Sequence, residues 1–472
     1  MGKSREKQLV KNTGILALGK ICTQFVSFFL LPLYTALLST KEYGTVDILN
    51  TYISLLIPLV FFQIDQAIFR FLIDVREDED GKSNIISTAI ITVSVQAILY
   101  ILVYLVVSIF IDNEYKYFLA FNVVASMFSN ILLQICRGLG DNTNYSLGSL
   151  VAGISTIVLN ILFIAVFKWG AYGMLSATLL ANILCALFIF FRKKIYKYLS
   201  IKRYNKEERK KLWKYSIPLI PNQLSWWVVN VSDRTIITNV LGLAANGIYS
   251  ASNKFSTICT TVFNIFNLTW SESASMHIKD GDASVFFSNI VNTAIKLFTS
   301  ICLGVVALMP FCFRFLITGS GYQDAYYQIP VLMLGTIFSV VVSLIGSIYI
   351  ALKKSNEIAK TSIYAAIINI VINILLIKRI GLYAASVSTL VAYFVMAFYR
   401  YIDVQKYVKI KLDVKMMIIS LFVAAFVIVV YYIRNTWLCI LGLIVIVVYF
   451  YISNRKLIGK FINIFKKKIK KA

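Results

Sequence analysis

The stretch 215–249, which reads YSIPLIPNQLSWWVVNVSDRTIITNVLGLAANGIY, decides what kind of fold this chain can have. It is long and apolar enough to cross a bilayer as a helix. Asp233 and Arg234 nevertheless stand side by side inside it. A charge at membrane depth is costly and needs a partner or a water-filled cavity. The stretch therefore predicts a membrane helix with one polar side.

The polar residues of this stretch recur at helical spacing. Steps of three or four residues put side chains on one face of a helix, and Leu224, Val228 and Val231 fall on the opposite face. Such a helix turns one face to lipid or packed protein and the other to a polar interior. The residues that share the polar face are Gln223, Trp227, Asn230, Arg234 and Thr238.

The composition of the whole chain agrees with this interpretation. Of its 472 residues, 59% are hydrophobic and only 15% are charged, whereas a soluble domain is about half apolar and about a quarter charged. A membrane β-barrel would show short alternating segments in place of apolar runs of about twenty residues. We therefore expect an all-α polytopic membrane protein.

The apolar runs predict about fourteen transmembrane helices. The N-terminal segment MGKSREKQLVK is basic, but no small-residue cleavage site follows the first run, so we expect an uncleaved first helix. The predicted spans are 13–38, 45–72, 85–111, 117–137, 146–167, 173–191, 215–240, 248–270, 286–313, 326–352, 361–377, 382–399, 416–433 and 438–452.

The distribution of Lys and Arg predicts the orientation. With a cytoplasmic N-terminus, the inside segments hold about 35 of the 47 basic residues, and this bias is the positive-inside pattern. Both termini are then cytoplasmic, and 192–214, 400–415 and 455–471 are the richest inside segments. The formal net charge of +25 thus follows from topology and from attraction to anionic membrane lipids, and we expect no nucleic-acid partner.

Short sequence matches link the two halves of the chain in the same order, at offsets of about 203 to 213 residues. Six spans separate the copies, which therefore have the same orientation, and parallel repeats of this kind are a transporter architecture. We expect two parallel six-helix repeats around a central cavity, plus two C-terminal helices. The matches are Leu38-(five residues)-Gly44 with Leu241-(five residues)-Gly247, Asn160-Ile-Leu-Phe-Ile with Asn373-Ile-Leu-Leu-Ile, and Gly170-Ala-Tyr with Gly381-Leu-Tyr.

These repeats divide the chain into four predicted parts. Residues 1–191 form an N-lobe with spans one to six, and 192–214 form a basic cytoplasmic linker. Residues 215–400 form a C-lobe with spans seven to twelve, and 401–472 hold the last two spans and a basic cytoplasmic tail.

Residue patterns for enzyme chemistry do not appear in the sequence. It contains no GxxxxGK[ST] phosphate loop, and its seven cysteines show no metal-binding spacing. The one histidine, His277, falls in a predicted loop. We expect no enzyme activity, no cofactor and no metal.

Several segments resemble the polysaccharide-transporter branch of the multidrug/oligosaccharidyl-lipid/polysaccharide exporter (MOP) superfamily, which includes O-antigen and capsule-type flippases. Length, topology and duplication agree with this resemblance over the whole chain. The segments are Ala67-Ile68-Phe69-Arg70-Phe71 before an acidic loop, Leu38…Tyr43-Gly44, and Pro218…Ser232-Asp233-Arg234…Leu241-Gly242…Gly247-Ile248-Tyr249-Ser250.

The resemblance implies a flippase in the bacterial inner membrane. Its substrate would be an undecaprenyl-pyrophosphate-linked oligosaccharide, moved from the cytoplasmic to the outer leaflet by alternating access for polysaccharide biosynthesis. A polysaccharide polymerase and glycosyltransferases would be partners, and we expect a monomer. Two alternatives in the same superfamily stay open: a multidrug/cation antiporter and a flippase for a lipid II type cell-wall precursor.

A lipid-linked pyrophosphate needs cations inside the membrane and polar or aromatic groups for its sugars. The candidate cations are Lys20, Arg234, Lys254 and Lys296, which would form a ladder across the bilayer, and the candidate sugar contacts are Trp227, Asn230 and Gln223.

Asp65 and Asp233 are the two carboxylates expected within spans, so the cations are in excess, which favours an anionic ligand. The opposing interpretation is structural, with Asp233 paired to Lys254. Asp233 and Asp65 are also the candidates for ion coupling.

Overall fold

The structure is a computed structural model that describes residues 28–469, and within this range all of its regular secondary structure is helical. Eleven of the described helices are long and apolar enough to cross a membrane. The chain is therefore a multi-pass membrane protein, as predicted, although the count of fourteen spans is not confirmed. A few side chains inside this range are not described: those of Asn222, Ser225, Trp226, Val229, Asn230, Leu268, Ser355, Lys456 and 460–469.

Three predicted spans, the first, the seventh and the eighth, have no counterpart among the eleven helices. The first, 13–38, lies mostly outside the described residues. The seventh and eighth correspond to α10 (Ile220–Leu241) and α11 (Leu243–His277), which carry polar residues throughout and are not among the eleven.

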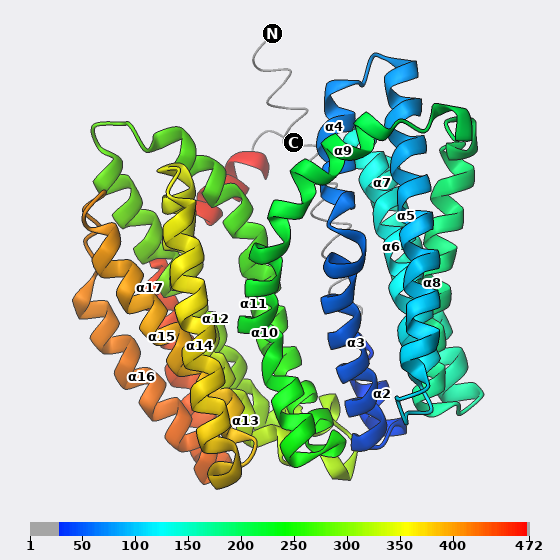
Figure 1. The fold of residues 1–472 in the computed structure, drawn as a ribbon. Helices are drawn as coiled ribbons and strands as arrows, with labels where there is room; N and C mark the ends of the chain where they lie inside the picture. Colours follow the sequence, from blue (N-terminus) through cyan, green and yellow to red (C-terminus); the bar gives the residue numbers. More distant parts are fainter. Residues whose placement is uncertain (1–27, 470–472) are drawn as a thin grey trace. The chain divides into compact units, whose positions relative to one another are not determined.

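The chain divides into two compact units, Met1–Gly247 and Ile248–Ala472. α10 and the first turn of α11 thus group with the first unit, whereas the predicted lobe boundary at 192–214 stays a prediction. In the first unit α8 packs against both α6 and α7, and α3 and α4 pack on α6 (Figure 1). Besides α10 and the start of α11, the α-helices described in this unit are α2 (Leu31–Leu37), α3 (Thr40–Phe61), α4 (Ile64–Asp74), α5 (Glu79–Ser108), α6 (Lys116–Gly138), α7 (Asn142–Asn160), α8 (Gly170–Arg192) and α9 (Lys206–Ser216).

The predicted second span, 45–72, is a broken helix. Phe62 and Gln63 have φ of 54° and 55°, and α3 ends and α4 begins at this point. Two successive left-handed residues other than glycine are costly and persist only where the surrounding packing holds them. Because irregular backbone at membrane depth must be buried in protein or line a cavity, the break marks a special position in the first unit.

The basic linker 192–214 is ordered on the first unit. Ser83 and Ser87 donate hydrogen bonds to Tyr198 O at 2.8 and 2.5 Å, and Asn205 N donates to Thr88 Oγ1 at 3.1 Å. Asn205 also caps α9, which packs on α4 and α5 and buries Leu212 fully. The linker is therefore a docked element and not only a solvated loop.

The start of α3 crosses the start of α11 through two glycines. A Cβ on Gly44 would overlap Leu243 O, and a Cβ on Gly247 would overlap Thr40 O. Only glycine permits this approach, since any side chain would meet backbone. The two glycines are the pair that the internal repeat matched in the sequence.

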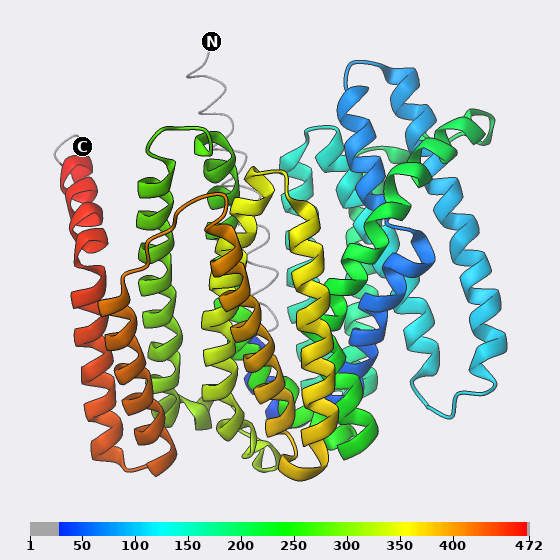
Figure 2. The ribbon, with the colours of Figure 1, turned by 60° about the vertical axis from the view of Figure 1, so that its left-hand side comes forward.

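In the second unit, α15 packs between α13 and α14, and α17 packs along α12 and α16 (Figure 2). A buried arginine lies inside this unit. Arg400, 3% exposed, donates to Thr361 Oγ1 at 2.9 Å, Val342 O at 2.9 Å and Ile358 O at 3.2 Å. The helices of this unit besides α11 are α12 (Ala283–Leu316), α13 (Ala325–Ala351), α14 (Ser355–Ile380), α15 (Tyr383–Val404), α16 (Val414–Ile433) and α17 (Thr436–Ile469).

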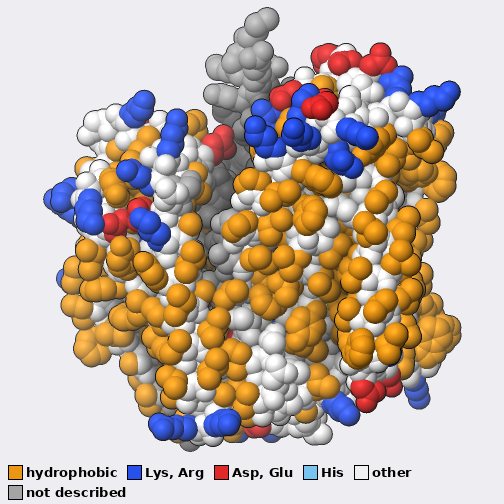
Figure 3. Space-filling view, viewed as in Figure 1, with side chains coloured by type: hydrophobic (Ala, Val, Ile, Leu, Met, Phe, Trp, Pro, Cys, Tyr) orange, Lys and Arg blue, Asp and Glu red, His pale blue; other side chains and the backbone are white. Residues whose placement is uncertain are grey.

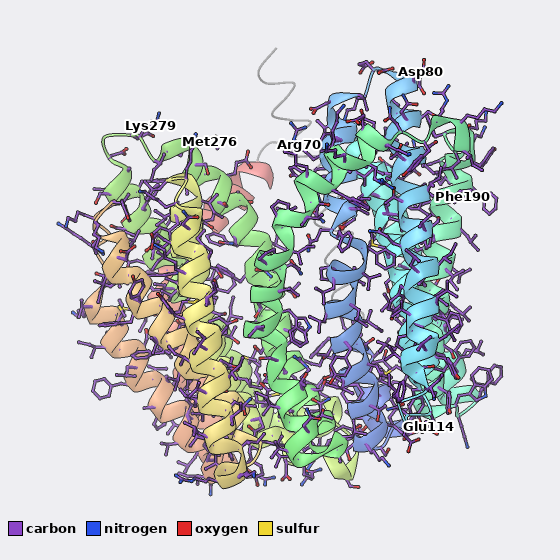
Figure 4. All side chains as sticks on the ribbon, in the orientation of Figure 1. Arg70, Asp80, Glu114, Phe190, Met276 and Lys279 are labelled. Atoms are coloured by element: carbon purple, nitrogen blue, oxygen red, sulfur yellow. The ribbon has the colours of Figure 1, made fainter. Side chains whose placement is uncertain are left out.

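Hydrophobic side chains cover the flanks of the helices in both units, and basic side chains gather near the helix ends (Figure 3). In the first unit Arg70 and Asp80 lie at one end and Glu114 at the other (Figure 4). An apolar band between two charged ends is the surface expected of a protein surrounded by lipid.

Candidate functional site

The candidate site is the contact between α3 and α10 in the first unit, which we call the α3–α10 polar face. On α3, Gly44, Asp47, Thr51 and Ser54 follow one another at steps of three, four and three residues. This spacing puts all four on one side of the helix. Each of them contacts α10 or the first turn of α11, so one stripe of α3 supplies half of the site.

Arg234 is held by a carboxylate of α3. Its Nε lies 2.9 Å from Asp47 Oδ2, and the two side chains are 13% and 16% exposed. An ion pair with little exposure is screened less than a surface pair. The charge that the sequence placed inside a span is thus paired with a residue almost two hundred positions earlier.

Asp233 adds a second carboxylate beside the same guanidinium. It is 5% exposed, its Oδ1 accepts from Arg234 N at 2.8 Å, and the same oxygen lies 3.7 Å from Arg234 Nη1. Among the described members of the α3–α10 polar face, two carboxylates therefore surround one guanidinium. The predicted excess of positive charge within the membrane stays a prediction, because Lys20 lies outside the described residues.

Asn246 and Trp227 fix the two ends of this face. Asn246 Nδ2 donates to Gly44 O at 2.9 Å and approaches Asp47 Oδ2 at 3.4 Å. Trp227 Nε1 lies 3.1 Å from both Thr51 O and Ser54 Oγ. The predicted polar stripe of α10 is confirmed for Trp227 and Arg234, which both turn toward α3.

Lys296 does not belong to this face. It lies on α12 in the second unit, where its Nζ is 2.6 Å from Asp413 Oδ2. Asp413 caps α16, and the hydrogen bond from Lys296 lowers the pKa of the Asp413 carboxyl. This pair ties the segment after α15 to α12, so the geometry gives Lys296 a structural partner.

The other predicted site residues are distributed as follows. Gln223 is exposed in the first turn of α10, and Lys254 is partly exposed on α11 in the second unit. Asp65 lies in the first turn of α4, just after the helix break, and accepts from Gln66 Nε2 at 2.7 Å. Lys20 and the side chain of Asn230 lie outside the described residues. Their predicted roles in substrate binding or ion coupling stay predictions.

Sequence reasoning missed Asp47, and its count of carboxylates within spans was wrong for that reason. Asp47 falls inside the predicted second span and three residues after Gly44. The signal that would have found it is the helical spacing from Gly44 through Thr51 to Ser54. Arg400 was also misplaced, because the sequence put it in the inside loop 400–415 and the structure buries it within α15.

Comparisons with known proteins agree with this architecture. Residues 9–270 match the family model described as polysaccharide biosynthesis protein. No curated protein matches the chain in sequence. An inward-facing multidrug resistance MATE family transporter of the MOP superfamily is similar in structure, with 12% identity, a TM-score of 0.68, and coverage of 83% of this chain and 98% of that chain.

Two further solved structures have the same fold. The lipid II flippase MurJ in an inward closed conformation shows 18% identity and a TM-score of 0.64, covering 95% of this chain and 98% of its own. A point mutant of the Vibrio cholerae MATE transporter VcmN shows 14% identity and a TM-score of 0.57, covering 86% and 97%. The family match spans more than half of the sequence and agrees with the motifs around Gly44 and Arg234, so the chain belongs to the polysaccharide biosynthesis protein family and has the two-lobed fold of MOP superfamily transporters.

Proposed function

We propose that this protein is a flippase for an undecaprenyl-pyrophosphate-linked oligosaccharide, which it moves from the cytoplasmic to the outer leaflet. The observation that carries the proposal is the pairing of Arg234 on α10 with Asp47 on the candidate membrane span α3 in a polysaccharide biosynthesis family member. Arginine presents a planar fork of donors that suits phosphate oxygens. A largely buried arginine in such a chain is the type of residue that would bind a pyrophosphate.

Asp47 serves in this proposal as the resident counter-ion of Arg234. With no substrate, the carboxylate holds the guanidinium and avoids an unpaired charge at low dielectric. A pyrophosphate group would compete for the same guanidinium, and Asp47 and Asp233 would oppose its entry electrostatically. Loading would therefore require one of the carboxylates to be neutralised by a proton or a cation.

This requirement supports cation coupling at the α3–α10 polar face. Movement of two negative charges outward down a negative-inside potential gains about 4.6 kcal/mol per 100 mV. That gain would drive the loaded step, and the neutralising cation would leave when the ion pair between Arg234 and Asp47 forms again. Membrane potential and a bound cation thus act on different steps of one cycle.

A second candidate function follows from the two carboxylates beside Arg234. Two carboxylates around one guanidinium would also suit a cationic substrate, as in a multidrug/cation antiporter. This alternative needs the arginine only as a structural partner. The two functions therefore differ in whether Arg234 or the two aspartates set substrate affinity.

Flipping in proteoliposomes tests the proposal. Purified protein is reconstituted with a fluorescent undecaprenyl-pyrophosphate oligosaccharide, and a membrane-impermeant reagent reports the fraction in each leaflet. We expect protein-dependent flipping that responds to a potassium-valinomycin potential at equal pH. Absence of flipping, together with proton-driven efflux of a cationic dye from the same vesicles, would favour the antiporter.

The orientation belongs to the proposal as well. The positive-inside pattern supports cytoplasmic termini in the inner membrane, with residue 205 inside and residue 435 outside. Reporter fusions at these positions test it. An extracytoplasmic reporter signal at residue 205 would contradict the orientation.

A further inference from the structure

A cavity of about 770 Å³ opens on the first unit between the end of α3, the middle of α5 and α9. This volume is in the range of small-molecule sites. Its apolar wall includes Leu59, Val95, Leu99 and Val103, which are 39% to 62% exposed. Exposed apolar residues on a membrane helix face lipid, so the cavity is open to the lipid phase.

Three polar side chains lining the cavity have buried polar atoms without a partner. Among the described residues, no hydrogen-bonding group reaches Gln96 Nε2 and Oε1, Tyr100 Oη or Trp213 Nε1. A buried polar group that lacks a hydrogen bond costs about 1–3 kcal/mol, so three together are not expected in a wall that packs only against acyl chains. Each of these atoms is buried beneath the cavity wall, so a ligand with polar atoms would give all three side chains a partner only after they turn toward the open space.

The cationic end of the cavity is Arg209. Its guanidinium lies 4.8 Å from the ring of Trp213 and 5.9 Å from the ring of Tyr204, and no described carboxylate forms an ion pair with it. Stacking on aromatic rings orients the guanidinium and leaves its N–H groups available to an anion. α9 begins beside Thr88 of α5, so Arg209 lies at the basic end of the cavity and Gln96 and Tyr100 lie farther along α5.

We propose that this cavity is a binding site for one anionic phospholipid. The phosphate would bind Arg209, and an acyl chain would lie along Leu99 and Val103. Once their side chains turn into the cavity, the Gln96 amide, the Tyr100 hydroxyl and the Trp213 indole N–H would donate to the ester carbonyl oxygens. The site offers donors from four side chains and one side-chain amide acceptor, which matches a ligand rich in oxygen acceptors.

The broken helix gives this site a link to the rest of the unit. Phe62, one of the two left-handed residues between α3 and α4, lines the cavity, and its ring contacts Trp213 edge to face at 6.0 Å. A lipid bound here would support the backbone break from outside. The site lies apart from Arg234 and Asp47, and the inference does not depend on which substrate the protein moves.

The test uses full-length protein in detergent and native mass spectrometry with phosphatidylglycerol, phosphatidylethanolamine and glycerol phosphate. We expect one tightly bound phosphatidylglycerol, and a Gln96→Leu, Tyr100→Phe double variant should lower its affinity about tenfold or more. Because this double variant removes unsatisfied polar atoms, its melting temperature without lipid should stay the same or rise. Arg209→Gln should weaken phosphatidylglycerol and leave phosphatidylethanolamine nearly unchanged.

Lys210→Gln is the matched control, since Lys210 is exposed on the same helix and does not line the cavity. Leu99→Trp is a second route that fills the open side of the cavity without changing a polar group. Unchanged phosphatidylglycerol binding in both Arg209→Gln and Leu99→Trp would overturn the proposal. Equal affinity for phosphatidylethanolamine, or the same stabilisation by glycerol phosphate alone, would overturn it too.

Discussion

Two arginines on long helices of this protein have opposite surroundings. Arg234 in the first unit is 13% exposed and has two carboxylates beside it. Arg400 in the second unit is 3% exposed and donates to backbone carbonyls and hydroxyls, with no described carboxylate in an ion pair with it. A guanidinium enclosed by neutral acceptors cannot exchange partners without unfolding its surroundings. One paired with a carboxylate at a partly open face can exchange it for another anion.

This difference gives Arg400 a structural role and supports the functional role that we propose for Arg234. Gly346 makes room for the Arg400 guanidinium, because a Cβ there would lie 3.0 Å from Nη1. The acceptors of Arg400 come from α13 and α14, so the arginine fastens α15 between them. The acceptors of Arg234 include the carboxylates of Asp47 and Asp233, whose negative charge a proton or another cation can neutralise. The contrast predicts that substitution of Arg400 affects folding and that substitution of Arg234 affects transport.

The largest effect is expected for Arg400→Leu. It removes the hydrogen bonds of the guanidinium, including the donors to the Thr361 and Ser362 hydroxyl oxygens, so the free energy of unfolding should fall by about 3 kcal/mol or more. Thermal unfolding in detergent measures the change, with exposed Arg379→Leu as the control. An Arg400→Leu protein of normal stability that fails only in transport would reverse the assignment of the two arginines.

A smaller effect is expected for Arg234→Gln, and it should appear in transport. Loss of a charged hydrogen-bond donor to a phosphate should lower the initial flipping rate about tenfold or more, with protein abundance near normal. Lys41→Gln, an exposed cation at the start of α3, is the matched control. Degradation of Arg234→Gln, with rescue of abundance by Asp47→Asn, would show that the pair is structural.

Asp47→Asn should strengthen the binding of a pyrophosphate lipid, in contrast to Arg234→Gln. Asp47→Asn removes a negative charge that competes with a phosphate for the Arg234 guanidinium, so the affinity for a pyrophosphate lipid should rise a few-fold while turnover falls. Equilibrium binding and initial flipping rates measured on the same preparation separate the two quantities. If the protein is a cation antiporter, Asp47→Asn should instead weaken binding of a cationic dye.

The smallest effect is expected at Lys296 and Asp413, which form a partly exposed ion pair. Because the pKa of Asp413 is lowered in the folded protein, the pair stabilises it above the unfolded pKa of about 4 and loses this contribution as pH falls through the folded pKa. Asp413→Asn should remove this pH dependence and cost at most about 1 kcal/mol at pH 7. If the melting temperatures of the wild-type protein and Asp413→Asn fall equally as the pH is lowered, other groups cause the acid sensitivity.

The general fold could be predicted from the sequence because bilayer-crossing helices must satisfy their own backbone hydrogen bonds. Apolar length therefore located α5, α6, α12, α13 and α16 within a few residues. The break at Phe62 and Gln63 could not be found in this way, since hydropathy continues across it and the packing that holds two left-handed residues comes from elsewhere in the chain.

The candidate site was predicted only in part for a similar reason. The spacing in 215–249 identified the polar face of α10, but a helical pattern on one element does not name its partner. Asp47, Thr51 and Ser54 join Arg234 and Trp227 only through tertiary packing. Likewise, the partners of Lys296 and Arg400 lie in segments whose approach no local pattern reports.

The crossing at Gly44 and Gly247 also bears on the origin of the chain. Each glycine faces the carbonyl of the residue four positions before the other, so the contact is reciprocal between the repeat copies. A reciprocal contact of one surface with itself is the isologous contact of a two-fold homodimer. If duplication joined the halves, this glycine would once have held together two separate half-length subunits. A substitution there would then have changed both sides of the contact at once, whereas in the fused chain a substitution changes only one side.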